Sequence, residues 1–160
     1  MQIEKQTVAA IAAKRILVVD DEAVMAEAIR AILRAEGHEV EAVGDGQTAL
    51  TKFEADRHDL VITDFRMAKM DGLELARAIR ALSAAQRIIV ITGDVGSIPG
   101  SQAESRDFNV LLAKPFSGAK LHEAVASLWQ YGERDQQQPS LREAIGPSGA
   151  FSDAVPGLGG

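Results

Sequence analysis

Five residues whose side chains could hold a metal ion or a phosphoryl group each end or follow a short apolar run of this 160-residue chain. Short apolar runs without alternation are typical of strands in a parallel sheet that helices cover on both faces. The carboxyl ends of such strands meet at one edge of the sheet, where ligands of this fold class bind. We therefore expect one site to contain Asp20, Asp21, Asp64, Thr92 and Lys114.

The residue types at this predicted site indicate its chemistry. Three carboxylates in a partly dry cleft cannot all stay ionised unless a cation lies among them, and a hard ion such as Mg²⁺ prefers oxygen ligands. The hydroxyl of Thr92 and the ammonium of Lys114 suit a phosphoryl group. Each acid alone could equally be a helix cap, which the helix dipole favours. The predicted chemistry therefore rests on the five residues together.

Helical patterns of apolar residues alternate with the apolar runs from residue 14 to about residue 131. A further strand is predicted over 38–43, where polar and apolar side chains alternate as in a half-exposed edge strand. Strict alternation with short connections predicts an α/β fold, a doubly wound parallel sheet of five strands with five helices. The intervals from Asp21 to Asp64, Thr92 and Lys114 each fit a whole number of strand and helix units.

The last two predicted helices differ in how clearly the sequence encodes them. Glycines and a proline within 93–100 crowd the expected start of the fourth helix, and they leave 101–108 as the part that can be helical. We expect this helix to be short or mobile. The fifth helix is predicted from a cap at Ser117 to Trp129, because apolar residues return there every three or four positions.

Length and composition limit the domain organisation. A chain of 160 residues with 46% hydrophobic residues can bury one sizeable core, predicted over 14–131, without room for a second full domain. Residues 1–13 are predicted to be an N-terminal extension, since the apolar stretch within them is too short for a signal peptide. Residues 132–160 are rich in Gly, Ser, Pro and Gln and are predicted to be a disordered tail.

Charge and residue usage argue against several classes of partner. The formal net charge of −6 argues against nucleic acid, because phosphate contacts need a concentrated basic patch. No apolar run approaches the roughly 20 residues that span a bilayer. The lack of cysteine rules out disulfides and thiolate metal sites and is compatible with the cytoplasm. His38, His58 and His122 lack the spacing of metal ligands and are predicted to be surface residues.

The site residues and the motifs around them resemble the receiver domain of bacterial two-component response regulators, over about residues 14–131. The resemblance rests on elements in matching order and spacing: Ile16 to Glu22 with its acidic pair, the segment from Asp64 through Met67, Met70-Asp71-Gly72, Thr92-Gly93 and Lys114-Pro115-Phe116. It implies a CheY-like fold with the flavodoxin-like strand order 2-1-3-4-5.

Carried over position by position, the resemblance implies a role for each site residue. Asp64 would be the phosphoacceptor, Thr92 the switch hydroxyl and Lys114 the cation that faces the phosphoryl oxygens. The ligands of Mg²⁺ would be Asp20, Asp21, Asp64 and the backbone carbonyl of Arg66. A carboxylate can act as the nucleophile that forms an acyl phosphate, while the metal ion and the lysine neutralise charge that would repel the attacking oxygen.

Two positions depart from the family pattern. Leu111 replaces the aromatic residue that usually lies three residues before the lysine, so coupling to the switch hydroxyl must use an aliphatic side chain or a different element. Ala68 replaces a proline often found in the loop after the phosphoacceptor, and we expect it to alter the stiffness of the loop and leave the chemistry intact. The resemblance also predicts that the Lys114-Pro115 peptide bond is cis.

The resemblance implies a single-domain response regulator, a switch that receives a phosphoryl group on Asp64 from a histidine kinase or a histidine phosphotransfer protein. The domain would catalyse this transfer and a slow dephosphorylation itself, but would not turn over a separate substrate, so we do not expect an enzyme in the usual sense. We expect output by protein contact in the cytoplasm, with no nucleic acid and no membrane, as a monomer or a weak phosphorylation-dependent dimer.

Two alternatives remain open at this point. One is a module with the receiver fold that signals by binding alone, independently of phosphorylation. The other is a phosphatase of the haloacid dehalogenase type, which also forms an aspartyl phosphate beside Mg²⁺. Such enzymes have a second aspartate two residues after the nucleophile, where this chain has Arg66, and the chain has no insertion of the size of a cap domain. This makes the phosphatase the weaker alternative.

Overall fold

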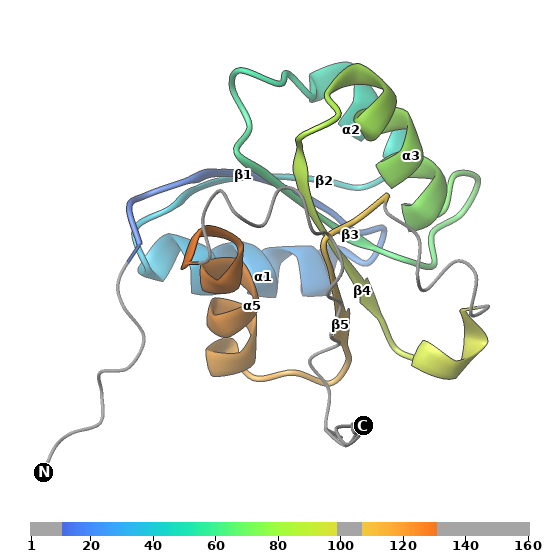
Figure 1. Cartoon of the computed structure of the whole chain (residues 1–160). Helices are drawn as coiled ribbons and strands as arrows, with labels where there is room; N and C mark the ends of the chain where they lie inside the picture. The colour runs from blue at the N-terminus through green and yellow to red at the C-terminus, as the bar shows by residue number, and fades with distance from the viewer. Residues whose placement is uncertain (1–10, 99–106, 131–160) are drawn as a thin grey trace, which may run out of the picture.

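The computed structural model describes residues 11–98 and 107–130 and contains a five-stranded parallel sheet in the order β2-β1-β3-β4-β5 (Figure 1). The strands are β1 (Arg15–Val19), β2 (Glu39–Val43), β3 (Leu60–Asp64), β4 (Arg87–Thr92) and β5 (Val110–Ala113). The helices are α1 (Ala23–Ala35), α2 (Gly46–Lys52), α3 (Gly72–Leu82) and α5 (Gly118–Gln130), with a 3₁₀ turn, η2 (Val95–Ser97). The predicted fold class and strand order are confirmed.

Helices cover both faces of the sheet. Successive strand residues point to opposite faces, so Leu17 of β1 joins one core cluster and Ile16 and Val18 join the other. The first cluster includes residues of α2 and α3, and the second includes residues of α1 and α5. Burial on both faces explains why the central strands are continuous apolar runs.

The strand β2 forms an edge of the sheet and is only partly buried. Glu39 is exposed and the four residues after it are half-buried, whereas every residue of β3 is buried. The alternating pattern of β2 is what a strand needs when one side faces the core and the other faces water. The prediction of a half-exposed edge strand is therefore confirmed.

Local signals in the sequence determine where the helices begin and end. Gly37 follows α1 with φ of +98°, a conformation that glycine adopts without strain. Asp71 and Glu74 form a capping box at the start of α3. The Ser117 side chain accepts a hydrogen bond from the Lys120 N–H at 3.1 Å, as predicted for the cap of the last helix.

Three predicted segments lie wholly or largely outside the described residues. The predicted fourth helix over 101–108 falls mostly on residues 99–106, and η2 precedes it. The predicted extension over 1–13 and the predicted tail over 132–160 likewise fall on residues that the structure does not describe, apart from 11–13. Within the described ranges, no helix has both the length and the apolar character needed to cross a membrane.

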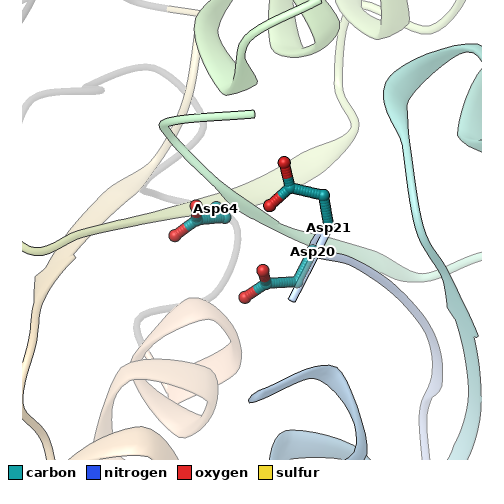
Figure 2. A group of neighbouring side chains, drawn as sticks. All are labelled: Asp20, Asp21 and Asp64. Atoms are coloured by element: carbon teal, nitrogen blue, oxygen red, sulfur yellow. The ribbon is translucent and has the colours of Figure 1, made fainter. Parts of the chain in front are cut away.

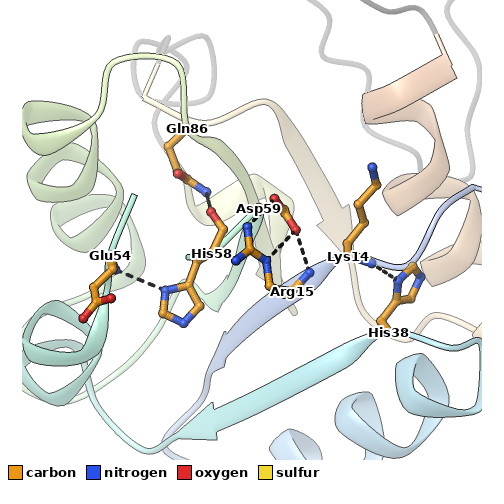
Figure 3. A network of polar contacts seen from close by, with 7 residues as sticks. All are labelled: Lys14, Arg15, His38, Glu54, His58, Asp59 and Gln86. Carbon is orange, nitrogen blue, oxygen red and sulfur yellow. Dashed lines mark hydrogen bonds and ion pairs between the residues drawn. The ribbon is translucent and has the colours of Figure 1, made fainter. Parts of the chain in front are cut away.

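A polar network joins the segments at the N-terminal ends of the strands (Figure 3). We call this end of the strands the N-terminal edge of the sheet; it lies opposite the carboxyl ends. Asp59 accepts hydrogen bonds from the backbone N–H of Arg15 at 2.8 Å and from its guanidinium at 3.3 Å. Gln86 donates to the carbonyl of His58 at 3.1 Å. These bonds connect the segments that lead into β1, β3 and β4.

The prediction that all three histidines are surface residues was wrong for His38 and His58, which are 5% and 4% exposed. The Nδ1 atom of His38 accepts the Lys14 N–H at 2.9 Å, and that of His58 accepts the Glu54 N–H at 3.1 Å. A neutral imidazole that accepts a backbone N–H is satisfied inside the protein, so its burial costs little. Sequence spacing carries no sign of these partners.

Candidate functional site

The two acidic segments meet where the strand order of the sheet reverses. Asp20 follows β1 directly, and Asp64 is the last residue of β3, the strand beside it. The register pairs Val19 with Thr63, so the residues after them lie at the same level. In open α/β sheets, ligands bind in the crevice at such a point. The topology therefore brings together acids that are far apart in the sequence.

Asp20, Asp21 and Asp64 each offer one carboxylate oxygen, and these three oxygens lie within 4.8 Å of one another. Figure 2 shows the three side chains converging from the ends of β1 and β3. Asp20 and Asp64 are only 2% and 7% exposed, whereas Asp21 is exposed to solvent. Three oxygens at this spacing form a donor set that suits a hard cation.

Burial opposes the ionisation of both buried acids. Loss of hydration, with a smaller effect of the Asp64 charge, raises the pKa of Asp20 to about 6 even though Asp20 accepts a hydrogen bond from the Glu22 N–H. Burial also raises the pKa of Asp64 above its usual value, against the opposing effect of Lys114. Neighbouring carboxylates that resist ionisation are stabilised by a cation placed between them.

Lys114 supplies a positive charge to this cluster from the end of β5. Its Nζ lies 3.0 Å from Oδ1 of Asp64, and the two side chains are 23% and 9% exposed. Burial lowers the pKa of Lys114, but the hydrogen bond and charge of Asp64, with the charge of Asp20, outweigh this effect, so the pKa is raised overall. Lys114 is therefore a permanent cation at neutral pH. The Lys114-Pro115 peptide is cis, as predicted.

Thr92 ends β4, between β3 and β5, and is buried. Its hydroxyl accepts a hydrogen bond from the Asp94 N–H at 3.1 Å, and its carbonyl accepts the Lys114 N–H at 2.8 Å. Within the described residues, no hydrogen bond joins the Thr92 hydroxyl to Asp64. The structure therefore gathers the three acids and Lys114 directly, and it places Thr92 beside them through the backbone.

The chain leaves the end of β3 through a loop that passes very close to Asp64. A Cβ atom at Gly72 would lie 2.2 Å from the backbone oxygen of Asp64, so only glycine fits there without displacing β3 or α3. The Gly72 N–H donates to the Phe65 carbonyl at 2.8 Å. Asp71 caps α3 by accepting the N–H groups of Leu73 and Glu74, each at 2.9 Å.

Two backbone N–H groups also reach the acid cluster. The Glu22 N–H donates to Oδ1 of Asp20 at 2.8 Å, and the Ala68 N–H donates to Oδ2 of Asp21 at 3.3 Å. Neither group was predicted from the sequence, and Gly72 was predicted only as part of a motif. Backbone donors cannot be predicted from residue type, except that proline lacks an N–H and Ala68 retains one.

The family model for the response regulator receiver domain matches residues 16–126, more than half of the chain. The chain belongs to the response regulator receiver family. Receiver domains are phosphoacceptors rather than enzymes in the usual sense, and response regulators receive their phosphoryl groups from histidine kinases. The family predicted from the motifs is therefore confirmed.

Curated relatives of this receiver domain include the DNA-binding response regulator MtrA of Mycolicibacterium smegmatis, 33% identical over 83% of this chain and 57% of that protein. The sensory transduction protein RegX3 of the same organism is 30% identical over 73% of this chain and 51% of that protein. The chain thus spans about half the length of the curated relatives it matches.

Solved structures of receiver proteins have the same fold. The response regulator TrrA of Thermotoga maritima, determined in complex with Mg²⁺ and BeF, is 35% identical, with a TM-score of 0.66 over 72% of this chain and 98% of that chain. The chemotaxis protein CheY4 of Vibrio cholerae is 28% identical, with a TM-score of 0.67 over 72% of this chain and 98% of that chain.

The functional roles of the individual residues remain predictions. Arg66 is exposed, and its guanidinium lies 5.7 Å from the centre of the Phe65 ring. The use of its backbone carbonyl as a metal ligand stays a prediction. Leu111 is 6% exposed and belongs to the same core cluster as Ile98 and Phe108. The position of the usual switch aromatic is therefore filled by a buried aliphatic side chain.

Proposed function

We propose that this receiver domain is a Mg²⁺-dependent switch in which Asp64 accepts a phosphoryl group from a histidine kinase or a histidine phosphotransfer protein. The observation that carries the proposal is the approach of Asp20, Asp21 and Asp64 within 4.8 Å, beside the ammonium of Lys114. A nucleophilic carboxylate, an acidic pair and a fixed cation are the groups that phosphoryl transfer to an aspartate requires.

In the transfer step, an oxygen of Asp64 attacks the phosphorus of a phosphohistidine. The new O–P bond forms as the P–N bond breaks, and the electron pair of that bond returns to the donor imidazole. Lys114, 3.0 Å from Asp64, neutralises charge on the incoming phosphoryl group. Water later cleaves the acyl phosphate, which releases inorganic phosphate and restores the carboxylate. The domain thus catalyses its own modification without turnover of a separate substrate.

The residues present fit a magnesium site. Asp20, Asp21, Asp64 and the backbone carbonyl of Arg66 would hold the ion, all through oxygen atoms. When bound, Mg²⁺ would supply positive charge to the transferring phosphoryl oxygens. Without a cation, burial raises the pKa of Asp20 to about 6 and that of Asp64 above its usual value, so the carboxylates gain from neutralisation.

Phosphorylation would act on the fold through Thr92. A phosphoryl group adds about 1.5 to 2 negative charges and three strong acceptor oxygens. The Thr92 hydroxyl already accepts the Asp94 N–H, and its own proton would be donated to a phosphoryl oxygen. The change would pass to the surface near Leu111 through aliphatic packing, because this position has no aromatic ring to rotate.

We further propose that the output is protein contact by a single-domain regulator in the cytoplasm, without nucleic acid or membrane, as a monomer or a weak phosphorylation-dependent dimer. The net charge of −6 supports the proposal on nucleic acid. The predicted organisation, a receiver over 14–131 between an extension and a disordered tail, is part of this proposal.

The test is incubation with acetyl phosphate, with and without Mg²⁺, followed by intact mass and peptide mapping. We expect one phosphoryl group on Asp64 of the wild type only when Mg²⁺ is present, and none on Asp64→Asn. Asp59→Asn, which changes an acid at the opposite edge of the sheet, is the control that keeps normal phosphorylation. Modification of Asp64→Asn to the wild-type extent would refute the proposal.

Two other outcomes would favour the alternatives. Sustained release of phosphate from small phosphate esters would favour the phosphatase of the haloacid dehalogenase type. Full function of Asp64→Asn in cells would favour a module that signals by binding alone.

A second candidate function is the receiver part of a DNA-binding regulator. The observation that favours it is the similarity to MtrA, which is named as DNA-binding and of which this chain spans about half. Immunoblotting of cell lysate with an antibody against this receiver domain, followed by a DNA-binding assay on the native protein, distinguishes the two. A native protein of about twice this length that binds specific genomic DNA would establish the second candidate, whereas a native protein of 160 residues would leave protein contact as the output.

A further inference from the structure

The loop between β3 and α3 reaches the acid cluster through a backbone donor. The Ala68 N–H donates to Oδ2 of Asp21 at 3.3 Å, and both residues are exposed. A proline, which often occupies this position in the receiver pattern, has no N–H and cannot make this bond. This chain therefore has a donor to Asp21 that a proline at position 68 would remove.

The loop fixes the position of this donor independently of Asp21. The Met70 N–H donates to the Ala68 carbonyl at 2.8 Å, and Lys69 between them has φ of +66°, which together form a γ-turn. The next residue is wedged against α2, because a Cβ atom at Gly46 would lie 2.7 Å from Sδ of Met70. The turn and this packing place the Ala68 N–H, so the hydrogen bond orients Asp21 rather than the loop.

A carboxylate has two oxygens, and holding one of them fixes the plane of the group and the direction of the other. Figure 2 shows the Asp21 carboxylate with one oxygen turned toward Asp64 and the other turned away. Asp20 shows the same division, since its Oδ1 accepts the Glu22 N–H. Asp21 is the exposed member of the cluster, so it has the most rotamer freedom to lose when a cation binds.

We propose that the backbone N–H of Ala68 is a positioning group that holds Asp21 ready for a divalent cation. This inference rests on the Mg²⁺ site of the proposed function and concerns how that site is assembled. Partners that orient metal ligands from the second layer strongly affect metal affinity. Because coupling between two events is reciprocal, Mg²⁺ binding should also strengthen the hydrogen bond and slow exchange of the Ala68 amide.

The sharpest variant replaces the Ala68 residue by lactic acid, which turns the backbone amide into an ester and removes the N–H while keeping the methyl group. Ala68→Pro removes the same N–H by ordinary mutagenesis, and Ala68→Ser is the matched control that keeps it. Calorimetric titration with Mg²⁺ should give about tenfold weaker binding for the ester and the proline variant and wild-type affinity for the serine variant. NMR hydrogen exchange on the wild type should show the Ala68 amide more protected with Mg²⁺ than without it.

The outcomes separate this inference from the proposed function. If the wild type binds Mg²⁺ and the ester variant binds it equally well, the positioning role is wrong while the magnesium site stands. A loss that appears in Ala68→Pro but not in the ester would show a distorted loop, and an equal loss in Ala68→Ser would show a side-chain effect; both overturn the inference. A wild type that does not bind Mg²⁺ overturns the proposed function itself.

Discussion

Asp59 and Asp20 are acids at opposite edges of the same sheet, and burial disfavours the ionised form of each. At Asp59 the hydrogen bonds and charge of Arg15 outweigh burial, so its pKa is lowered. At Asp20 burial prevails over the Glu22 hydrogen bond, and the pKa is raised to about 6. An ionised aspartate thus stabilises the fold at one edge, through Asp59, and destabilises it at the other, through Asp20.

The partners of the two edges explain this difference. At the N-terminal edge, His38, His58 and Gln86 each make hydrogen bonds within the fold (Figure 3). At the C-terminal edge, which we also call the acid edge, three carboxylates face one another (Figure 2). The ammonium of Lys114 pairs with one of them, Asp64. Unfavourable charge that persists in a folded protein is typical of a site built for a ligand. The edge that is less stable alone is the one we assign to function.

The largest expected effect concerns the backbone that shapes the acid edge. Gly72→Ala would place a Cβ atom 2.2 Å from the Asp64 carbonyl oxygen, and neither backbone segment can yield easily. We expect a loss of about 3 kcal/mol or more in the free energy of unfolding, measured by urea denaturation. Gly44→Ala is the control, since a Cβ atom there meets nothing within 4 Å. Equal stability of the two variants would mean that the loop does not pass Asp64 so closely.

The next largest effect should be an increase in the free energy of unfolding. Asp20→Asn removes a carboxylate that is harder to ionise in the folded state, so we expect the variant, without Mg²⁺, to be more stable than the wild type by about 2 kcal/mol at neutral pH. Since the folded pKa lies above the unfolded one, this gain should shrink as the pH falls from about 6 toward 4. Urea denaturation at several pH values measures it. A destabilised variant at pH 7 would show that Asp20 contributes to the fold.

An aspartate-to-asparagine substitution at the N-terminal edge should lower the free energy of unfolding. Asp59→Asn loses the charge that pairs with Arg15, and we expect a loss of about 1 kcal/mol at neutral pH. The pKa of Asp59 is lower in the folded state than in the unfolded state. The stability that its charge contributes should therefore be lost as the pH falls below the usual pKa of an aspartate. The measurement is urea denaturation, paired with that of Asp20→Asn. Two variants that shift stability in the same direction would remove the contrast between the edges.

A smaller pH effect should come from His38. Burial lowers its pKa, opposed by the Glu36 charge, and its Nδ1 accepts the Lys14 N–H, so protonation must break that bond. A folded pKa below the unfolded value means that stability falls as the pH drops below about 6.5. His38→Asn keeps an acceptor that cannot titrate. In an Asp20→Asn background, thermal unfolding between pH 7 and pH 5 should show less acid destabilisation with His38→Asn than without it.

The two edges also differ in how much of each could be predicted from the sequence. At the acid edge, the residues follow directly on apolar runs, and parallel topology makes their meeting predictable from Asp20, Asp64 and Lys114 alone. The N-terminal edge gave no such signal, and His38 and His58 were wrongly placed on the surface. Their burial depends on backbone N–H groups that only the folded chain brings to them.

Within the acid edge, the features that the family motifs specify were also easier to predict than the path of the loop after β3. The cis peptide before Pro115 and the strand order followed from the family motifs. The donation from Ala68 to Asp21 and the close approach of Gly72 to Asp64 depend on the path of the loop, which residue types do not specify.

The most direct test of the functional acid edge is the effect of Mg²⁺ on the free energy of unfolding of the wild type, Asp20→Asn and Asp59→Asn. A ligand that binds only the folded state stabilises it by mass action. We predict that Mg²⁺ stabilises the wild type and Asp59→Asn alike, and that Asp20→Asn is the most stable protein without Mg²⁺ and gains the least from it. Equal gains in all three proteins, or no gain in the wild type, would contradict the assignment of the acid cluster as a cation site.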